Sequence, residues 1–249
     1  MSENHRVPSP ALASAPTPVA PVAWRPLAVL RAAWLRAAVV VAVAFALLLV
    51  LGNGAILGTS LWVRHTVQPA QAPLRSISNV RVVDAKLWRG AAPGRHGYHA
   101  LAASGVTTIV DLRAEEYVHV DDPLLAALGL RLVRIPIRDG QTPSRQQVDR
   151  FLATVRASPG LVYVHCGAGV GRTGAMVAAY LIASREANPG QALRSNLAVG
   201  PPSLEQIAFA AGLDPRHAKG VGIAVTTVSR ILDAPRRLWS RLTAPATAA

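Results

Sequence analysis

The chain has 249 residues, enough for a short leader and one domain, and its single cysteine, Cys166, excludes an intrachain disulfide and a cysteine-rich metal site. Its formal net charge of +13 is concentrated at the two ends: residues 1–75 carry six arginines against Glu3, and residues 216–249 carry six basic residues against Asp233. Such ends favour an anionic membrane surface or phosphate over nucleic acid, because the basic residues are not interleaved with aromatic ones as in a nucleic-acid-binding patch.

The amino-terminal part predicts a disordered leader followed by a membrane helix. Residues 1–36 are basic and rich in Pro and Ala, and residues 37–63 carry no charge. As a helix, the uncharged segment would be about 40 Å long, enough to cross a hydrocarbon layer of about 30 Å. Trp34 and Trp62 lie near its ends as expected of interfacial anchors. We therefore expect one transmembrane helix.

This helix predicts a single-pass protein in a cell membrane of the bacterial type. The side of the membrane on which the rest of the chain lies is left open, because the arginines before and after the span nearly balance. A cleaved signal peptide, with Ala70–Ala72 before the cleavage point, is the alternative.

After a linker at residues 64–77, residues 78–213 read as one α/β domain. Short β-branched runs alternate there with longer helical patterns. We expect strands or hairpins at 81–90, 106–113, 131–137 and 160–165, and helices at 96–105, 144–158 and 173–187. This alternation predicts a central, mostly parallel sheet flanked by helices.

Residues 214–249 form a basic, partly amphipathic tail. The segment from Ile223 to Leu242 is apolar on one side, and Pro235 is expected to interrupt it. Such a helix either packs on its own domain or lies on a membrane surface.

The stretch VHCGAGVGRTG, from Val164 to Gly174, follows a predicted strand and precedes a predicted helix. Its glycines allow backbone conformations that direct several N–H groups towards one point, as in anion-binding loops at helix N-termini. The same partial positive charge favours the thiolate form of Cys166, which is the nucleophilic form.

Arg172 lies six residues after Cys166. If the loop curls around a tetrahedral oxyanion, this spacing returns a guanidinium to the centre, where it can hold two oxygens at once. The hydroxyl of Thr173 can then donate to the sulfur when the sulfur is a leaving group.

The segment HCGAGVGRTG satisfies the signature H-C-x5-R-[ST], and the chain here resembles the cysteine-dependent protein tyrosine phosphatase superfamily. The compact dual-specificity branch is the nearer match, over about residues 78–213. LWRGAAP and GVTTIVDLR resemble the opening segments of that branch, IPIRDGQTPS resembles its general-acid loop, and GPPSLEQIAF loosely resembles a late segment that includes Gln206.

The resemblance implies roles for individual residues. Cys166 would attack phosphorus, Arg172 would hold the phosphoryl oxygens, Asp139 would act as general acid and then general base, and His165 would orient the thiol. The phosphate-binding loop would comprise Gly167, Ala168, Gly169, Val170, Gly171 and Arg172. No metal and no cofactor are expected.

Other residues remain candidates or rivals. Asp111, Asp121, Asp122 and the pair Glu115–Glu116 are alternative acids, and Arg89 and Arg113 are expected to be structural ion-pair partners. Gly169, Gly171 and Gly174 also fit the dinucleotide fingerprint G-x-G-x-x-G. That interpretation is disfavoured, because the following stretch does not resemble a strand that ends in an acidic residue.

The loop favours protein phosphotyrosine, or another phosphomonoester, as the substrate. Superfamily members that act on inositol lipids tend to have lysines in the loop, where this chain has Gly167 and Val170. The membrane helix and the basic tail favour the alternative, a lipid or phosphoinositide-like phosphate. A catalytically silent phosphate-binding module is the second alternative.

Overall fold

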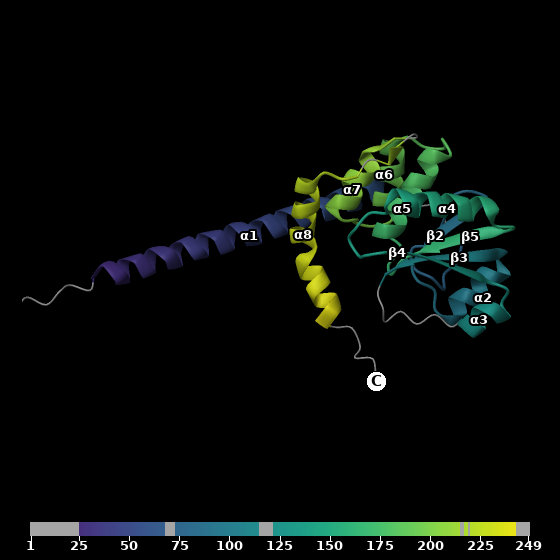
Figure 1. Cartoon of the computed structure of the whole chain (residues 1–249), viewed down its shortest axis with the longest axis horizontal. Helices are drawn as coiled ribbons and strands as arrows, with labels where there is room; N and C mark the ends of the chain where they lie inside the picture. The colour runs from purple at the N-terminus through teal and green to yellow at the C-terminus, as the bar shows by residue number, and fades with distance from the viewer. Residues whose placement is uncertain (1–24, 68–72, 115–121, 215–216, 219, 243–249) are drawn as a thin grey trace, which may run out of the picture. The chain divides into compact units, whose positions relative to one another are not determined.

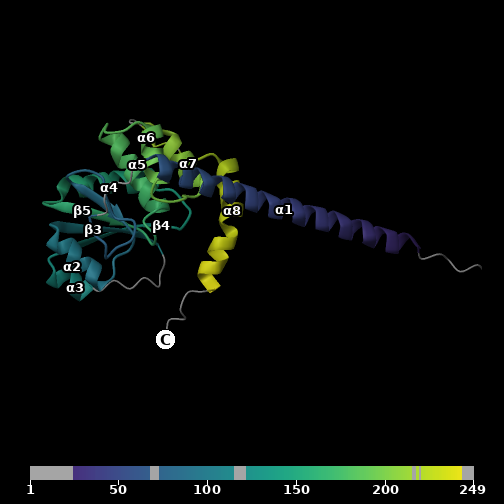
Figure 2. The same cartoon turned by 180° about the vertical axis from the view of Figure 1, so that it is seen from behind.

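The computed structural model describes residues 25–67, 73–114, 122–214, 217–218 and 220–242. It separates into two compact units, Met1–Phe45 and Ala46–Ala249. Figures 1 and 2 show the elements of the second unit from opposite sides. The first 24 residues of the predicted leader (1–36), the Ala70–Ala72 segment and the candidate acids at 115, 116 and 121 lie outside the described residues. The rest of that leader, from Arg25, is helical and not disordered.

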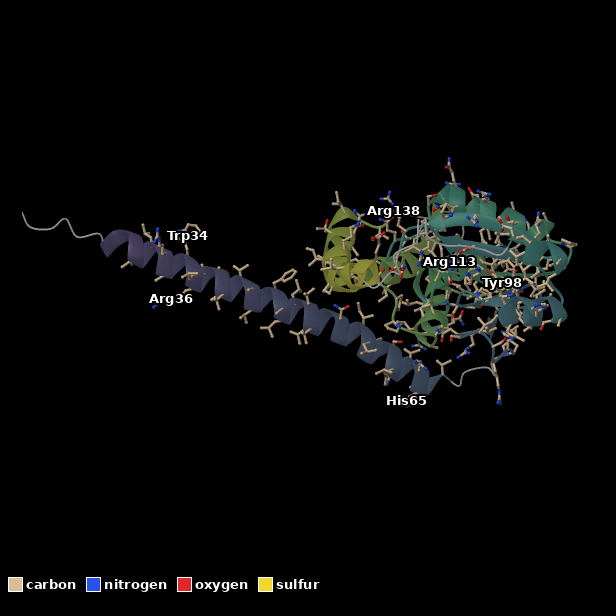
Figure 3. All side chains as sticks on the ribbon, turned by 90° about the horizontal axis from the view of Figure 1, so that it is seen from below. Trp34, Arg36, His65, Tyr98, Arg113 and Arg138 are labelled. Atoms are coloured by element: carbon tan, nitrogen blue, oxygen red, sulfur yellow. The ribbon has the colours of Figure 1, made fainter. Side chains whose placement is uncertain are left out.

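Helix α1 (Arg25–Thr66) includes the predicted span and extends it at both ends. Its aliphatic side chains are largely exposed, and Figure 3 shows Trp34 and Arg36 projecting from it. By length and composition, Val29–Thr66 qualifies as a helix that can cross a membrane, and its apolar part is not buried within the protein. The flanking residues are mostly Ala, Leu and Arg, which favour helix, so the helix continues past the apolar run.

The last turns of α1, which belong to the second unit, pack against the end of helix α6 (Pro189–Leu197). The hydroxyl of Ser60 donates to the carbonyl of Leu197 at 2.7 Å, and Val63 is buried. The segment expected to be a linker from residue 64 therefore begins as helix, which ends at Thr66.

A five-stranded sheet in the order β1-β2-β5-β3-β4 forms the centre of the second unit. Strands β2 (Leu87–Gly90), β5 (Leu161–His165), β3 (Val106–Arg113) and β4 (Arg131–Ile137) are parallel, and β1 (Arg81–Val82) pairs antiparallel with β2. The predicted mostly parallel α/β sheet is confirmed. All four parallel strands end at the same edge, and β5 lies in the middle of it.

Two hydrophobic cores cover the two faces of the sheet. On one face, α4 (Arg145–Ala157) and α5 (Gly171–Ala183) cover the sheet, and α6 (Pro189–Leu197) and α7 (Leu204–Ala211) pack on α5 (Figure 1). On the other face, α2 (Arg95–Ala103) and α3 (Asp122–Ala127) cover it. Successive residues of β5 alternate between the cores: Val162 and Val164 face the first, whereas Tyr163 faces the second.

Three described helices and a small hairpin were not among the predicted elements. Helix α3 is only six residues long, and α6 and α7 lie in the Gly- and Pro-containing stretch after residue 187. Capping boxes begin both later helices: Asn188 with Gln191 for α6 and Ser203 with Gln206 for α7. Strands β6 (Leu213–Asp214) and β7 (His217–Ala218) pair antiparallel.

Helix α8 (Ile223–Leu242) has the bounds expected of the amphipathic tail segment. Pro235 lies inside this helix and does not end it, contrary to expectation. Within the second unit, Leu232 packs against Gly52 of α1, and the side-chain amide of Asn53 donates to the carbonyl of Leu232 at 3.3 Å. The N–H of Glu205 on α7 also donates to the hydroxyl of Ser229 on α8 at 3.0 Å, and this contact agrees with the expectation that the tail helix packs on its own domain.

The buried imidazole of His165 at the end of β5 gives a prediction about acid stability. Burial lowers the pKa of His165 from 6.5 to about 4, although the neighbouring Asp111 opposes this shift. Between these values the unfolded chain binds a proton that the folded chain does not, so stability is lost as the pH falls from about 6.5 to 4. The loss should be about 3 kcal/mol.

Thermal unfolding of the full chain in detergent measures this loss as a fall in Tm of about 6–12 °C over that pH range. His165→Gln should flatten the dependence, whereas His99→Gln, at an exposed histidine on α2, should leave it intact. A slope that is equally steep without His165 would contradict the assignment.

Candidate active site

The loop that carries Cys166 lies between β5 and α5, at the edge where the parallel strands end. This is the position at which open parallel sheets bind ligands. Cys166 is 3% exposed, and it belongs to the core cluster between the sheet and α5. The loop residues therefore have a rigid strand on one side and a rigid, buried helix on the other.

The carbonyl groups of the loop point outwards, to donors that precede strand β3 in the chain. The N–H of Ala92 donates to Gly167 O at 2.9 Å, and the side-chain amide of Asn79 donates to Ala168 O at 2.9 Å. The guanidinium of Arg89 donates to the next two carbonyls, Gly169 O at 2.8 Å and Val170 O at 3.3 Å.

These outward carbonyls fix the direction of the loop's N–H groups. In a trans peptide the N–H points away from the C=O of the same unit, so the N–H groups of residues 168–171 point away from Asn79, Arg89 and Ala92. Within the described residues, the N–H groups of Ala168, Gly169 and Val170 have no hydrogen-bond acceptor. Together with the N-terminus of α5 they form a set of convergent donors suited to an anion.

Arg172 connects the loop with the segment after β4. Its Nη1 donates to the carbonyl of Ile137 at 3.1 Å, and its Nη2 lies 3.3 Å from Oδ1 of Asp139. The guanidinium is 5% exposed and the Asp139 side chain 44% exposed, so the carboxylate lies at the surface and the guanidinium below it. The structure thus brings Arg172 and Asp139 together, and Arg172 Nη2 also lies next to Gly167, the residue that follows Cys166.

The residues on either side of Cys166 and Arg172 are buried. Nδ1 of His165 donates to the main-chain carbonyl of Cys166 at 3.1 Å, which places the imidazole against the backbone of the nucleophile. His165 also stacks on Tyr163, with ring centroids 5.9 Å apart. The hydroxyl of Thr173 is fully buried and, within the described chain, has no hydrogen-bond partner.

Helix α7 holds the segment that contains Asp139. Ser203 donates its hydroxyl to Gly140 O at 2.8 Å, and the side-chain amide of Gln206 donates to Gln141 O at 3.0 Å. The Gln206 side chain also packs against Gly171, where a Cβ would collide with it. Gln206 therefore contacts both the start of α5, at Gly171, and the segment that contains Asp139.

The other candidate acids are placed differently. Asp111 is buried, and both of its oxygens accept hydrogen bonds from Arg113, so the expected ion pair of Arg113 is confirmed. Burial would raise the pKa of Asp111, but the hydrogen bonds and charge of Arg113 outweigh it and lower the pKa. Asp122 is exposed in the first turn of α3. Figure 3 shows Arg113 at the end of β3 and Arg138, next to Asp139, on the segment after β4.

Arg89 is not the ion-pair partner that the sequence led us to expect. Besides the two loop carbonyls, its guanidinium donates to Oδ1 of Asn196 at 3.0 Å, and the described residues place no carboxylate against it. Asn196 packs against Gly174, where a Cβ would overlap the amide. Sequence reasoning missed Asn196, because a single buried Asn in a polar stretch leaves no periodic signal.

The order of the elements after α5 argues against a dinucleotide-binding unit. The next element is α6, and not the strand ending in an acidic residue that a dinucleotide-binding unit has. The glycines of the fingerprint have other contacts here: Gly169 lies against Gly90, and Gly171 and Gly174 lie against Gln206 and Asn196.

Gly169 provides a test of the loop's geometry. Its φ is +74°, and a Cβ at this position would collide with the backbone of Gly90 and Ala91, which cannot move aside as a side chain can. Gly169→Ala should therefore cost more than the roughly 1–2 kcal/mol of a left-handed non-glycine residue. We expect phosphomonoesterase activity to fall at least about tenfold.

Gly94→Ala is the matched control, since a Cβ there has nothing within 4 Å and the residue has no positive φ. Activity with p-nitrophenyl phosphate and Tm, measured on both variants, check the prediction. Equal behaviour of the two alanine variants would mean that the loop does not have this conformation.

Comparisons with known proteins identify the family to which the chain is related. Residues 67–211 match the family described as DSP-PTPase phosphatase fused to NAD+ kinase. The chain is 38% identical over 96 residues to the chloroplastic NAD kinase 2 of Arabidopsis thaliana, covering 36% of this chain and 10% of that protein. It is 37% identical over 79 residues to the dual specificity protein phosphatase CDC14A of Mus musculus, covering 32% and 13%. The chain thus spans about a tenth of the length of these curated relatives.

Solved structures give similar matches. TpbA of P. aeruginosa in complex with pTyr is 23% identical, with 66% of this chain and 94% of that chain covered and a TM-score of 0.48. The core catalytic domain of the PP-IP phosphatase SIW14 of S. cerevisiae is 16% identical, with 67% and 96% covered and a TM-score of 0.48.

The family match covers more than half of the 249 residues and includes the whole loop from Cys166 to Arg172. The chain belongs to the PTP-NADK family of dual-specificity-type, cysteine-dependent protein tyrosine phosphatase domains.

Proposed function

We propose that the chain is a membrane-anchored phosphatase that hydrolyses phosphomonoesters, with protein phosphotyrosine as the preferred substrate. The observation that carries the proposal is the meeting of Arg172 with Asp139, at 3.3 Å, beside a loop whose carbonyls all point outwards. A nucleophile, an oxyanion site and a candidate acid are then combined in one place.

In the first step, the thiolate of Cys166 attacks phosphorus and the bond from phosphorus to the leaving oxygen breaks. The N–H groups of the loop and the guanidinium of Arg172 hold the phosphoryl oxygens, where negative charge must be stabilised. Asp139 gives its proton to the leaving oxygen, so the alcohol departs neutral. His165 supports the backbone of the nucleophile through its bond to Cys166 O.

In the second step, water attacks the phosphocysteine and the bond from phosphorus to sulfur breaks. Asp139, now a carboxylate, takes the proton of that water. The buried hydroxyl of Thr173 supplies a donor for the departing sulfur, a role compatible with its lack of another partner among the described residues. The loop and Arg172 then release inorganic phosphate.

The substrate preference follows from the side chains of the loop. Residues 167–171 are Gly, Ala, Gly, Val and Gly, so Arg172 is the one charged side chain that the loop itself contributes. One phosphoryl group is therefore bound by main-chain donors and one guanidinium, which suits a phosphate on a flat, uncharged phenol. A multiply phosphorylated inositol headgroup would leave its other phosphates without a cation from the loop.

The anchor and the domain limits are part of the same proposal. The membrane-spanning part of α1 would lie within residues 37–63, before the last turns at Ser60 and Val63 that pack on the domain. Residues 78–213 would form the phosphatase domain, and residues 214–249 would be an accessory tail. Exposed Val, Leu and Phe side chains along α1 support the anchor, because such a surface is costly in water. Reconstitution of the full chain into vesicles, followed by carbonate extraction, tests it, and release into the soluble fraction would contradict it.

Replacing the nucleophile is the first test of the chemistry. Cys166→Ser should lower kcat for p-nitrophenyl phosphate by at least about a thousandfold, because an alcohol is hardly ionised at neutral pH. The full chain in detergent is assayed, and stabilisation of both proteins by inorganic phosphate serves as the control for an intact loop. Comparable turnover by the two proteins would exclude cysteine chemistry.

Replacing the acid is the second test. Asp139→Asn should lower kcat about 10²–10⁴-fold with an alkyl phosphate and much less with p-nitrophenyl phosphate, whose leaving group needs little protonation. Asp149→Asn, at an exposed aspartate on α4 that pairs only loosely with Arg145, should change neither rate. Equal losses on both substrates would assign Asp139 a positioning role through Arg172 instead.

The substrate class is measured with the same preparations. A panel of phosphotyrosine peptides and phosphoinositide vesicles is compared by kcat/KM, with Cys166→Ser as the blank. Higher kcat/KM on the vesicles would replace the phosphotyrosine assignment by the lipid one.

A further inference from the structure

A cavity of about 250 Å³ lies beside the β1–β2 hairpin, against residues of α5 and α6. Its wall is mainly aliphatic, with two arginines and one serine. The residues that line it are Val67, Arg81, Val82, Val83, Arg89, Val177, Leu181, Ser195, Ala198 and Val199. None of these residues has a part in the proposed reaction.

The two arginines of the wall face each other across the hairpin. Arg81 and Arg89 are directly paired residues of antiparallel strands, so their side chains emerge on the same face. Like charges in this position repel each other and destabilise the hairpin. An anion between them would remove that repulsion.

Arg89 is a buried cation with neutral partners. Its side chain is 3% exposed, its described acceptors are two carbonyls and one amide oxygen, and its Nε has no hydrogen-bond partner among the described residues. The pKa of Arg89 is lowered to about 10, mainly by burial; Cys166 opposes this shift and Arg81 adds to it, so the guanidinium remains charged at neutral pH. Buried charges in proteins are normally paired with an opposite charge.

The size and lining of the cavity define the ligand that fits. At about 30 Å³ for each water-sized group, 250 Å³ holds roughly eight such groups. The aliphatic wall suits a short hydrocarbon segment, and the arginine pair suits one carboxylate or phosphate. An adjoining cavity of about 330 Å³ shares Arg81 and Ala198 and adds Arg64 and His65 from the end of α1, which extends the basic side of the site.

We propose that this cavity binds a small amphiphilic anion, with its charged group between Arg81 and Arg89 and its aliphatic segment against Val177 and Leu181. The site is separate from the phosphate-binding loop but is connected to it. Arg89 donates to the carbonyls of Gly169 and Val170, so an anion that draws its guanidinium away weakens the bonds that orient the loop. Binding should therefore lower kcat for the phosphomonoester, with or without a rise in KM.

Hexanoate is a suitable probe, and the full chain in detergent is the protein to use. Isothermal titration calorimetry is run in inorganic phosphate at a concentration that saturates the catalytic loop. Inorganic phosphate, like acetate, lacks the hydrocarbon chain and should bind the cavity only weakly at that concentration. Hexanoate should bind with a stoichiometry of one. It should bind at least about tenfold more tightly than hexanol, which lacks the charge, because a charge-assisted hydrogen bond is worth about 1.5–3 kcal/mol. It should also bind at least about tenfold more tightly than acetate, which lacks the chain.

Two variants test the charge and the volume of the cavity separately. Arg81→Gln removes the partner cation, and Ala198→Leu fills the cavity without changing its charge; each should weaken hexanoate binding about tenfold or more. Arg131→Gln, at an exposed arginine of β4 on the opposite edge of the sheet, is the matched control and should bind like the parent. Partition of hexanoate into micelles is the same for all four proteins, and Tm verifies that each is folded.

Binding that persists in phosphate and is lost in both variants would establish the site independently of the phosphatase activity. Hexanoate that competes with inorganic phosphate, or that binds Arg81→Gln and Ala198→Leu as well as the parent, would overturn the proposal. So would a rise in KM for p-nitrophenyl phosphate without a fall in kcat, since that result places the anion in the catalytic loop.

Discussion

The outward direction of four consecutive carbonyls, those of residues 167–170, is the constraint on which the site depends. A loop can direct its N–H groups to one side only if its C=O groups find donors on the other side, because a buried main-chain group without a partner is costly. Ala92, Asn79 and Arg89 supply these donors. The edge hairpin and the residues next to it, far from Cys166 in the sequence, therefore hold the loop in the conformation that the proposed phosphate binding needs.

The same logic explains how the acid segment is held. Ile137 O accepts from Arg172, Gly140 O from Ser203, and Gln141 O from Gln206, so three main-chain carbonyls of one short stretch have partners on α5 and α7. Asp139 lies within this stretch, and its carboxylate points at the guanidinium that also belongs to the loop. The position of the acid is thus determined by its backbone more than by its own side chain, which leaves the carboxyl group available for proton transfer.

The sequence allowed the parallel sheet, its main helices and the cysteine loop to be predicted, because β-branched runs and a spaced Cys–Arg signature are local patterns. The exact strand limits at 106–113 and 131–137 followed from such runs. The residues that form hydrogen bonds with the loop could not be predicted from such local patterns. Arg89 was expected to be an ion-pair residue and Asn196 was not singled out, because a contact across 107 residues depends on how the hairpin and α6 pack, which no local pattern encodes. Likewise α6 and α7 were missed, although each begins with a capping box, because short helices between Gly and Pro lack a clear apolar period.

The charges around the loop also indicate how a bound phosphate would change the site. Arg172 is buried and has a carboxylate, Asp139, as its neighbour. A phosphoryl dianion held by the loop would become the main counter-charge of that guanidinium. In the proposed reaction, the ion pair between Arg172 and Asp139 is thus a resting arrangement that substrate would replace.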